Sequence, residues 1–275
     1  MKKALIIISC LFLLAVGFWS IVLPEQFVIN LIENSFDSER LYLKPEGFKK
    51  GFLYSFRAEK IVLMKRGDSQ EKEPRTQGYS VSETPVLTFD HLRGRINLLS
   101  LLRLSPRLDF DCTVSGGPVR GDVALTGTGR TRIDGTDIQL QGIPLFEQIG
   151  VHGDGNLSVT FTQGSGKGEI RFSLNNARLK ATSFGGIFVP LDLFHMVKGA
   201  LVLNGGTLST QSFGIYGSGV YARLAGNITD GDLNMKLELM MDSTFTSAPA
   251  FQSLLEQYKV SPGYYVIPVK TRVAL

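Results

Sequence analysis

The chain has 275 residues, with 29 Lys and Arg against 25 Asp and Glu, a net charge of +4 and only two cysteines. Cys10 and Cys112 lie far apart in the sequence, one of them in an uncharged N-terminal run. This rules out the disulfide framework that supports many small secreted domains.

The N-terminal run Ala4–Leu23 contains 20 residues without a charge, follows Lys2 and Lys3, and ends before Pro24. At about 1.5 Å per residue, a helix of this length matches the roughly 30 Å hydrocarbon core of a bilayer. Lysines before the run favour a cytoplasmic N-terminus. We therefore expect a single-pass bacterial inner-membrane protein. Its parts are a cytoplasmic tip at 1–3, a transmembrane helix at 4–23 and a periplasmic β-rich domain at 24–275.

Two alternatives for this run stay open. A cleaved signal peptide has a shorter apolar region of about 7–15 residues, and Ala15–Gly17 is a passable cleavage site, but apolar residues continue beyond it. A lipoprotein would carry its lipid on Cys10, yet only six residues of the run precede that cysteine. The uncleaved anchor fits better, and Trp19 would then lie near the outer membrane interface.

Basic residues are concentrated directly after the predicted membrane helix. Residues 40–107 hold 14 Lys and Arg against 7 Asp and Glu. This excess predicts either contact with anionic lipid headgroups or simply a solvated basic surface. Nucleic acid is not an expected partner for a domain outside the cytoplasm.

The first part of the outer domain alternates between short elements. A short helix is expected over 25–36, where apolar residues recur at helical spacing. Residues 66–80 are polar and read as a loop, and 96–102 as a turn of helix. Strands are expected at 40–43, 51–56, 58–64 and 86–89.

From residue 106 onward, apolar and polar residues alternate with a period of two, which is typical of antiparallel sheet. The clearest stretches are 108–114, 157–162, 170–174 and 235–241. Cys112 is in phase with the apolar set and is expected to be a buried small side chain. Glycine supports hairpins, since 24 of the 30 glycines lie in 115–275, at junctions such as 116–117, 164–166 and 205–206.

Three segments within this region are predicted to be helical and could cap the sheet or cover its apolar face: 144–150, 190–197 and 249–258. The fold class is therefore mainly β, a transmembrane helix followed by a long antiparallel meander with a few short helices. The apolar face could be covered as an ordinary core or stay open as a groove, and large exposed apolar patches mark lipid or protein binding.

No pattern of catalytic, cofactor-binding or metal-binding residues is recognisable. His91, His152 and His195 lack companions at ligand spacing, and His195 is expected to be a packing residue in a short apolar helix. The segment 164–168 resembles a phosphate loop only superficially and is expected to be a hairpin turn. Asp109 and Asp111 could form a carboxylate pair, but a solvated edge is preferred. We expect a protein that is not an enzyme and needs no cofactor.

Several segments resemble a known family. The run Lys49–Phe56 follows the membrane helix, and Gly199–Leu208 and Leu224–Ile228 show glycine-punctuated strands similar to those of AsmA-like envelope proteins. The arrangement looks like the type II secretion system protein N (GspN) family. This resemblance implies a non-catalytic inner-membrane component of type II secretion, with other secretion components as partners. AsmA-like relatives imply the alternative, a groove that binds or transfers phospholipid between membranes.

Overall fold

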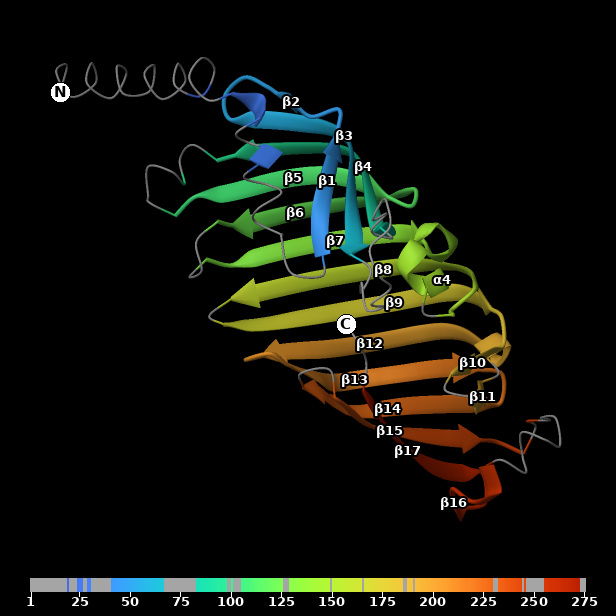
Figure 1. Ribbon diagram of the computed structural model, residues 1–275. Helices are drawn as coiled ribbons and strands as arrows, with labels where there is room; N and C mark the ends of the chain where they lie inside the picture. Colours follow the sequence, from blue (N-terminus) through green and yellow to red (C-terminus); the bar gives the residue numbers. More distant parts are fainter. Residues whose placement is uncertain are drawn as a thin grey trace, which may run out of the picture.

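The computed structural model describes residues 19, 24–26, 29–30, 41–66, 83–97, 100, 105–125, 129–148, 150–164, 166–184, 187–189, 191–229, 232–243, 245 and 255–272. Most of these residues form strands (Figure 1). In chain order the strands are β1 (Leu41–Glu46), β2 (Lys49–Lys50), β3 (Ser55–Arg66), β4 (Glu83–Ile96), β5 (Arg107–Val114), β6 (Gly117–Ala124), β7 (Thr131–Gln139), β8 (Gly153–Gly164), β9 (Lys167–Leu179), β10 (Thr182–Phe184), β11 (Ile187–Val189), β12 (Phe194–Asn204), β13 (Thr207–Gly217), β14 (Val220–Thr229), β15 (Asp232–Met241), β16 (Lys259–Ser261) and β17 (Tyr264–Arg272). The helical elements with described bounds are η2 (Leu140–Gly142), α4 (Pro144–Gln148) and η3 (Leu191–Leu193).

Fifteen of these strands form one antiparallel sheet, in the order β1-β3-β4-β5-β6-β7-β8-β9-β12-β13-β14-β15-β17-β16, with β2 also paired to β3. The hairpin β10–β11 stands apart as a small second sheet. Nearly every strand therefore pairs with its neighbours along the chain. The predicted mainly-β antiparallel meander is confirmed.

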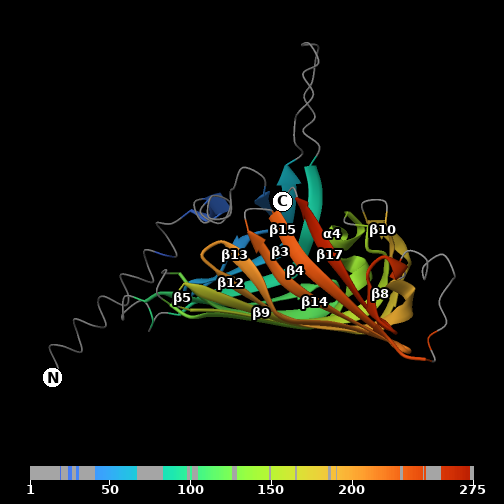
Figure 2. The same ribbon diagram turned by 90° about the horizontal axis from the view of Figure 1, so that it is seen from below.

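The large sheet is strongly curved, and its two ends rise on the same side of the central strands (Figure 2). Three β-bulges contribute to this shape, because an extra residue bends the strand that carries it. Each bulge holds a non-glycine residue in the left-handed region with φ near +53°: His91 in β4, Asp137 in β7 and Asn176 in β9.

Apolar side chains point to the concave side. Ile143 and Phe146, in and beside α4, pack on Cys112, Val119 and Ile138 of β5–β7, and α4 lies inside the curve of the sheet (Figure 2). Further buried clusters lie at β1–β4, at β14–β17 and beneath η2. Within the described ranges, no large side chain is less than 2% exposed. The apolar face is thus covered in places and lacks a closed core.

The glycine-containing turns, the buried cysteine and the alternating strands lie where the sequence predicts them. The glycines at 116–117, 164–166 and 205–206 lie in the hairpins β5–β6, β8–β9 and β12–β13. Cys112 is buried at 5% exposure, as expected. The alternating stretches that were predicted as strands all lie within β5, β8, β9 and β15.

Two predicted elements are wrong. Residues 190–197 are not a helix, since η3 is a single turn and β12 begins at Phe194, whose backbone pairs with β13. Hydrogen bonds to a strand that follows later in the chain override the local helical pattern. The strand expected at 51–56 is instead a turn up to Tyr54, with Leu53 and Tyr54 at positive φ, and β3 starts at Ser55.

Other predictions are tested in part or not at all. The helix expected at 144–150 is confirmed as α4. Residues 25–26, 29–30 and 255–256 are helical, and the rest of those two predicted helices lies mostly outside the described residues. So do residues 67–80 of the loop expected at 66–80, whose first residue, Arg66, ends β3, and the predicted membrane helix apart from Trp19. Among the residues described, no helix combines the length and apolarity needed to cross a bilayer.

Candidate functional site

The central strands carry a continuous apolar surface on the concave side of the sheet, which we call the trough. Strand register places its members opposite one another, as in the pairs Phe161–Ile170 and Ile170–Leu201, and farther along Leu208–Ile228. All are partly exposed, and none belongs to a buried cluster. The trough comprises Phe161, Ile170, Phe172, Leu201, Leu208, Phe213, Leu224, Ile228 and Leu233.

Helical elements cover only one margin of this surface. Gln148 at the end of α4 donates from Nε2 to the carbonyl oxygen of Pro85 in β4, at 2.6 Å. Phe146 of the same helix packs against residues of β8 and β9 as well as β5–β7. The helix therefore spans from β4 to the central strands and closes one side of the concavity.

The floor of the trough offers hydrocarbon in place of hydrogen-bonding groups. Thr210 lies in the same row, opposite Leu201. Its Oγ1 donates to the Gly226 carbonyl at 3.1 Å and accepts from the Gly226 N–H at 2.8 Å. The hydroxyl is thus engaged within the sheet, where β13 and β14 shift register. A ligand in the trough would meet apolar atoms.

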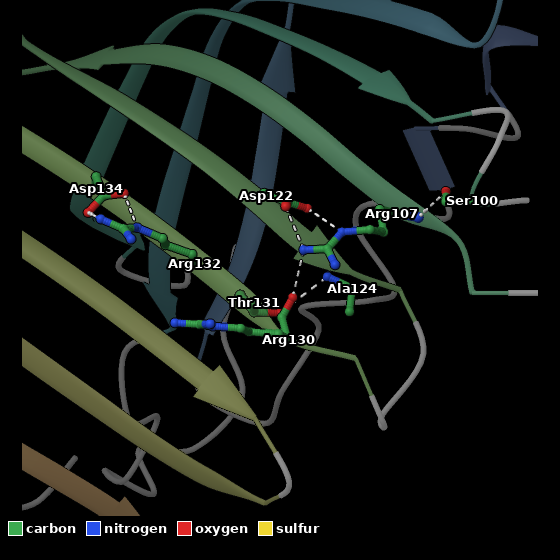
Figure 3. A network of polar contacts seen from close by, with 8 residues as sticks. All are labelled: Ser100, Arg107, Asp122, Ala124, Arg130, Thr131, Arg132 and Asp134. Atoms are coloured by element: carbon green, nitrogen blue, oxygen red, sulfur yellow. Dashed lines mark hydrogen bonds and ion pairs between the residues drawn. The ribbon is translucent and has the colours of Figure 1, made fainter. Parts of the chain in front are cut away.

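The opposite face of the sheet is polar and carries a network of ion pairs (Figure 3). Arg107 donates from Nε and Nη2 to both carboxylate oxygens of Asp122, at 2.7 and 2.5 Å, and from Nη2 to the carbonyl of Arg130. Arg132 pairs with Asp134, which also accepts from Thr160. The hydrogen bonds from Arg132, with a smaller contribution from Thr160, hold the pKa of Asp134 below its ordinary value.

The polar face also carries a shallow hollow over β3–β6, with a volume of about 1290 Å³, which we call the basic depression. Two carboxylates, Asp109 and Asp111, lie among its lining residues. The basic side chains that line it are Lys50, Arg57, Arg93, Arg95 and Arg120. Asp109 and Asp111, considered as an acid pair in the sequence, lie opposite Arg95 and Arg93. Their surroundings are those of a charged surface.

The three histidines are not brought together. His91 occupies the bulge in β4 at the basic depression, and His152 is exposed before β8. His195 is exposed in β12, so its predicted role as a packing residue of a helix is wrong; its neighbour Phe194 is buried instead. In the part of the chain that the structure describes, no three His, Cys, Asp or Glu side chains are arranged to hold a metal.

Sequence reasoning missed the basic depression as a site. It noted the excess of positive charge over 40–107, but the cations of the depression come from four strands that only the register brings together. Comparison with protein-family models, curated proteins and solved structures finds no match to this chain. What the two surfaces bind therefore has to follow from their own residues.

Proposed function

We propose that this chain is a non-catalytic bacterial envelope protein that holds lipid acyl chains in the trough. In this proposal, residues 4–23 anchor it in the inner membrane and the sheet lies in the periplasm. The observation that supports it best is the apolar row across β8–β15, which stays partly exposed while buried clusters lie elsewhere on the sheet. Exposed apolar surface of this continuity is typical of a binding site.

Hydrocarbon suits the trough better than a peptide does. A peptide lying across the floor would bury backbone N–H and C=O groups against apolar side chains, and each such group costs free energy when it lacks a hydrogen bond. An acyl chain has no such groups. The hydroxyl of Thr210 is already engaged with Gly226 and adds no polar anchor.

The length of the trough also fits an acyl chain. It crosses six strands from β8 to β15, and strands lie about 4.8 Å apart, so its length is about 24 Å. One leaflet of a bilayer core is about 15 Å deep, half of the roughly 30 Å total. An acyl chain drawn from a leaflet can therefore lie entirely within the trough.

Photocrosslinking in cells tests this proposal. Benzoylphenylalanine placed at position 201 or 228 of the full chain should capture phospholipid, identified by mass spectrometry. The matched control is position 202, because Val202 is adjacent to Leu201 but faces the polar side, opposite Glu169. Equal lipid capture at 201 and 202, or capture of only protein at 201, would contradict a lipid-binding trough.

A second candidate is a component of type II secretion, the role implied by the resemblance to the protein N family. The observation that favours it is an open sheet edge. The N–H of Val266 donates to the Tyr258 carbonyl, but from Ile267 onward β17 pairs only with β15 among the described strands. A partner strand could add there, although Pro268 lacks a donor on that edge.

A deletion strain separates the two candidates. Quantitative proteomics of periplasm and medium should show exported enzymes trapped in the periplasm if the chain serves secretion. Normal secretion together with an altered, leaky outer membrane supports lipid handling instead.

A further inference from the structure

We propose that the basic depression docks the domain on the headgroups of an anionic phospholipid bilayer. This proposal does not depend on what the trough binds, because the depression lies on the opposite, polar face of the sheet. Its lining includes the exposed residues Arg57, Arg93, Arg95 and Arg120, which alternate along the strands with buried residues such as Phe56, Gly94 and Val119.

Like charges face one another in this depression. The register pairs Lys49 with Arg57, and Arg57 directly with Arg93, so three cations form a row across β2, β3 and β4. Like charges opposite one another on neighbouring strands destabilise a sheet. An anion that bridges them would remove this repulsion.

Several cations elsewhere on the polar face are paired with carboxylates. There, Arg107, Arg132, Arg171 and Lys236 each form an ion pair with a nearby carboxylate, at 2.5–2.9 Å. In the described part of the chain, Arg57, Arg93, Arg95 and Arg120 form no ion pair, even though Asp109 and Asp111 lie on the adjoining strand. All four guanidinium groups belong to exposed residues. Their charge is available to an external partner.

The position of Trp19 connects this surface with the uncharged run Ala4–Leu23. The indole Nε1 of Trp19 donates to the Gly51 carbonyl at 3.0 Å, and Lys50 donates from Nζ to the Trp19 carbonyl at 2.6 Å. Gly51 and Lys50 both line the basic depression. Trp19, a residue of this run, therefore contacts the domain at the margin of the depression.

A bilayer fits these features better than a small anion does. The depression is wide and open, and its cations come from β2, β3, β4 and β6 of a sheet whose neighbouring strands lie about 4.8 Å apart, so they match an array of phosphates. Each Lys or Arg close to an anionic leaflet contributes about 1 kcal/mol, or about fivefold in the docking equilibrium. Four arginines are sufficient to hold a tethered domain against the membrane.

A fluorescent reporter in the depression tests the proposal on the full chain. In a Cys10→Ser, Cys112→Ala background, Thr113→Cys provides a single thiol among the lining residues for an environment-sensitive dye. The labelled protein is reconstituted into vesicles of phosphatidylcholine, alone or mixed with phosphatidylglycerol. The mixed vesicles should shift the dye emission to the blue and permit quenching by headgroup-labelled lipid, and high salt should reverse both effects.

Substitution of the four arginines by glutamine (Arg57→Gln, Arg93→Gln, Arg95→Gln, Arg120→Gln) should shift the docking equilibrium at least about tenfold toward the undocked state. The matched control has the same change of charge elsewhere on the sheet (Arg132→Gln, Arg171→Gln, Arg178→Gln, Arg223→Gln) and should dock normally. Circular dichroism checks that both variants fold. Equal loss in the control, or a dye that does not distinguish the two vesicles, would overturn the proposal. So would an equal response to inorganic phosphate or an acidic peptide without vesicles, which would assign the depression to a soluble anion.

Discussion

The ring of Phe110 in β5 lies over Gly121 of β6, in the space that a side chain at position 121 would occupy. The same relationship recurs between Phe56 and Gly94 and between Phe172 and Gly199. Side chains converge on the concave face of a curved sheet. An aromatic ring on that face therefore requires a neighbouring residue that has no side chain. The ring in turn covers a glycine that would otherwise weaken its strand.

The variant Gly121→Ala should destabilise the fold by about 1–3 kcal/mol, because the new methyl group overlaps the Phe110 ring. Urea denaturation would measure the change in unfolding free energy. Gly164→Ala is the control, since a Cβ there meets nothing within 4 Å. Adding Phe110→Leu to Gly121→Ala should recover part of the loss; an unchanged midpoint for Gly121→Ala would show that the ring moves aside freely.

Asn176 is held in the left-handed region at φ +53° by the bulge in β9. A β-branched residue tolerates this conformation poorly, so Asn176→Val should cost about 1–2 kcal/mol of stability. Asn176→Gly should be close to neutral, because glycine adopts positive φ without strain. Thermal unfolding of the two variants compares them directly. Similar melting temperatures would show that the backbone at 176 relaxes.

Burial raises the pKa of the Cys112 thiol to about 11, with smaller contributions from Asp111 and Asp90. The thiolate is the reactive form, so at pH 8 its population should be about a hundredfold below that of an ordinary thiol of pKa 9.0. In a Cys10→Ser background, a disulfide reagent should label the native protein slowly and the urea-unfolded protein at once. Fast native labelling would mean that β5 and β6 open readily.

The folded protein holds the pKa of Asp134 below its value in the unfolded chain. The ionised carboxylate therefore stabilises the fold at pH values above the unfolded pKa. This contribution is lost as the pH falls through the lower, folded value. Arg132→Gln should raise the Asp134 pKa and flatten the dependence of the urea midpoint on pH below about pH 4. The change should be small, because the Asp134 side chain is 38% exposed. A loss of stability in acid as large as the loss at neutral pH would contradict this assignment.

The sequence was sufficient for the elements whose signal is local. Period-two alternation identified β5, β8, β9 and β15, and closely spaced glycines identified the turns of the hairpins β5–β6, β8–β9 and β12–β13. It failed at β12, where the residues after Pro190 have a helical pattern but their backbone bonds with β13.

The two surfaces, the trough and the basic depression, were only partly predictable, because only their local features are encoded in a sequence pattern. A continuous apolar face follows from alternation, but whether it is covered depends on where helices such as α4 pack. The opposition of Arg57 and Arg93 depends on register across a loop, and no local pattern encodes it.

The order of strands in the sheet has a consequence for how the molecule forms and varies. Because almost every contact between strands joins chain neighbours, each hairpin can assemble from a short loop closure, and short sequence separation favours rapid folding. Each hairpin is thus a unit that pairs mainly with the hairpins next to it in the chain. Inserting or removing one hairpin within β12–β15 would lengthen or shorten the concave surface by about 10 Å without rethreading any other strand.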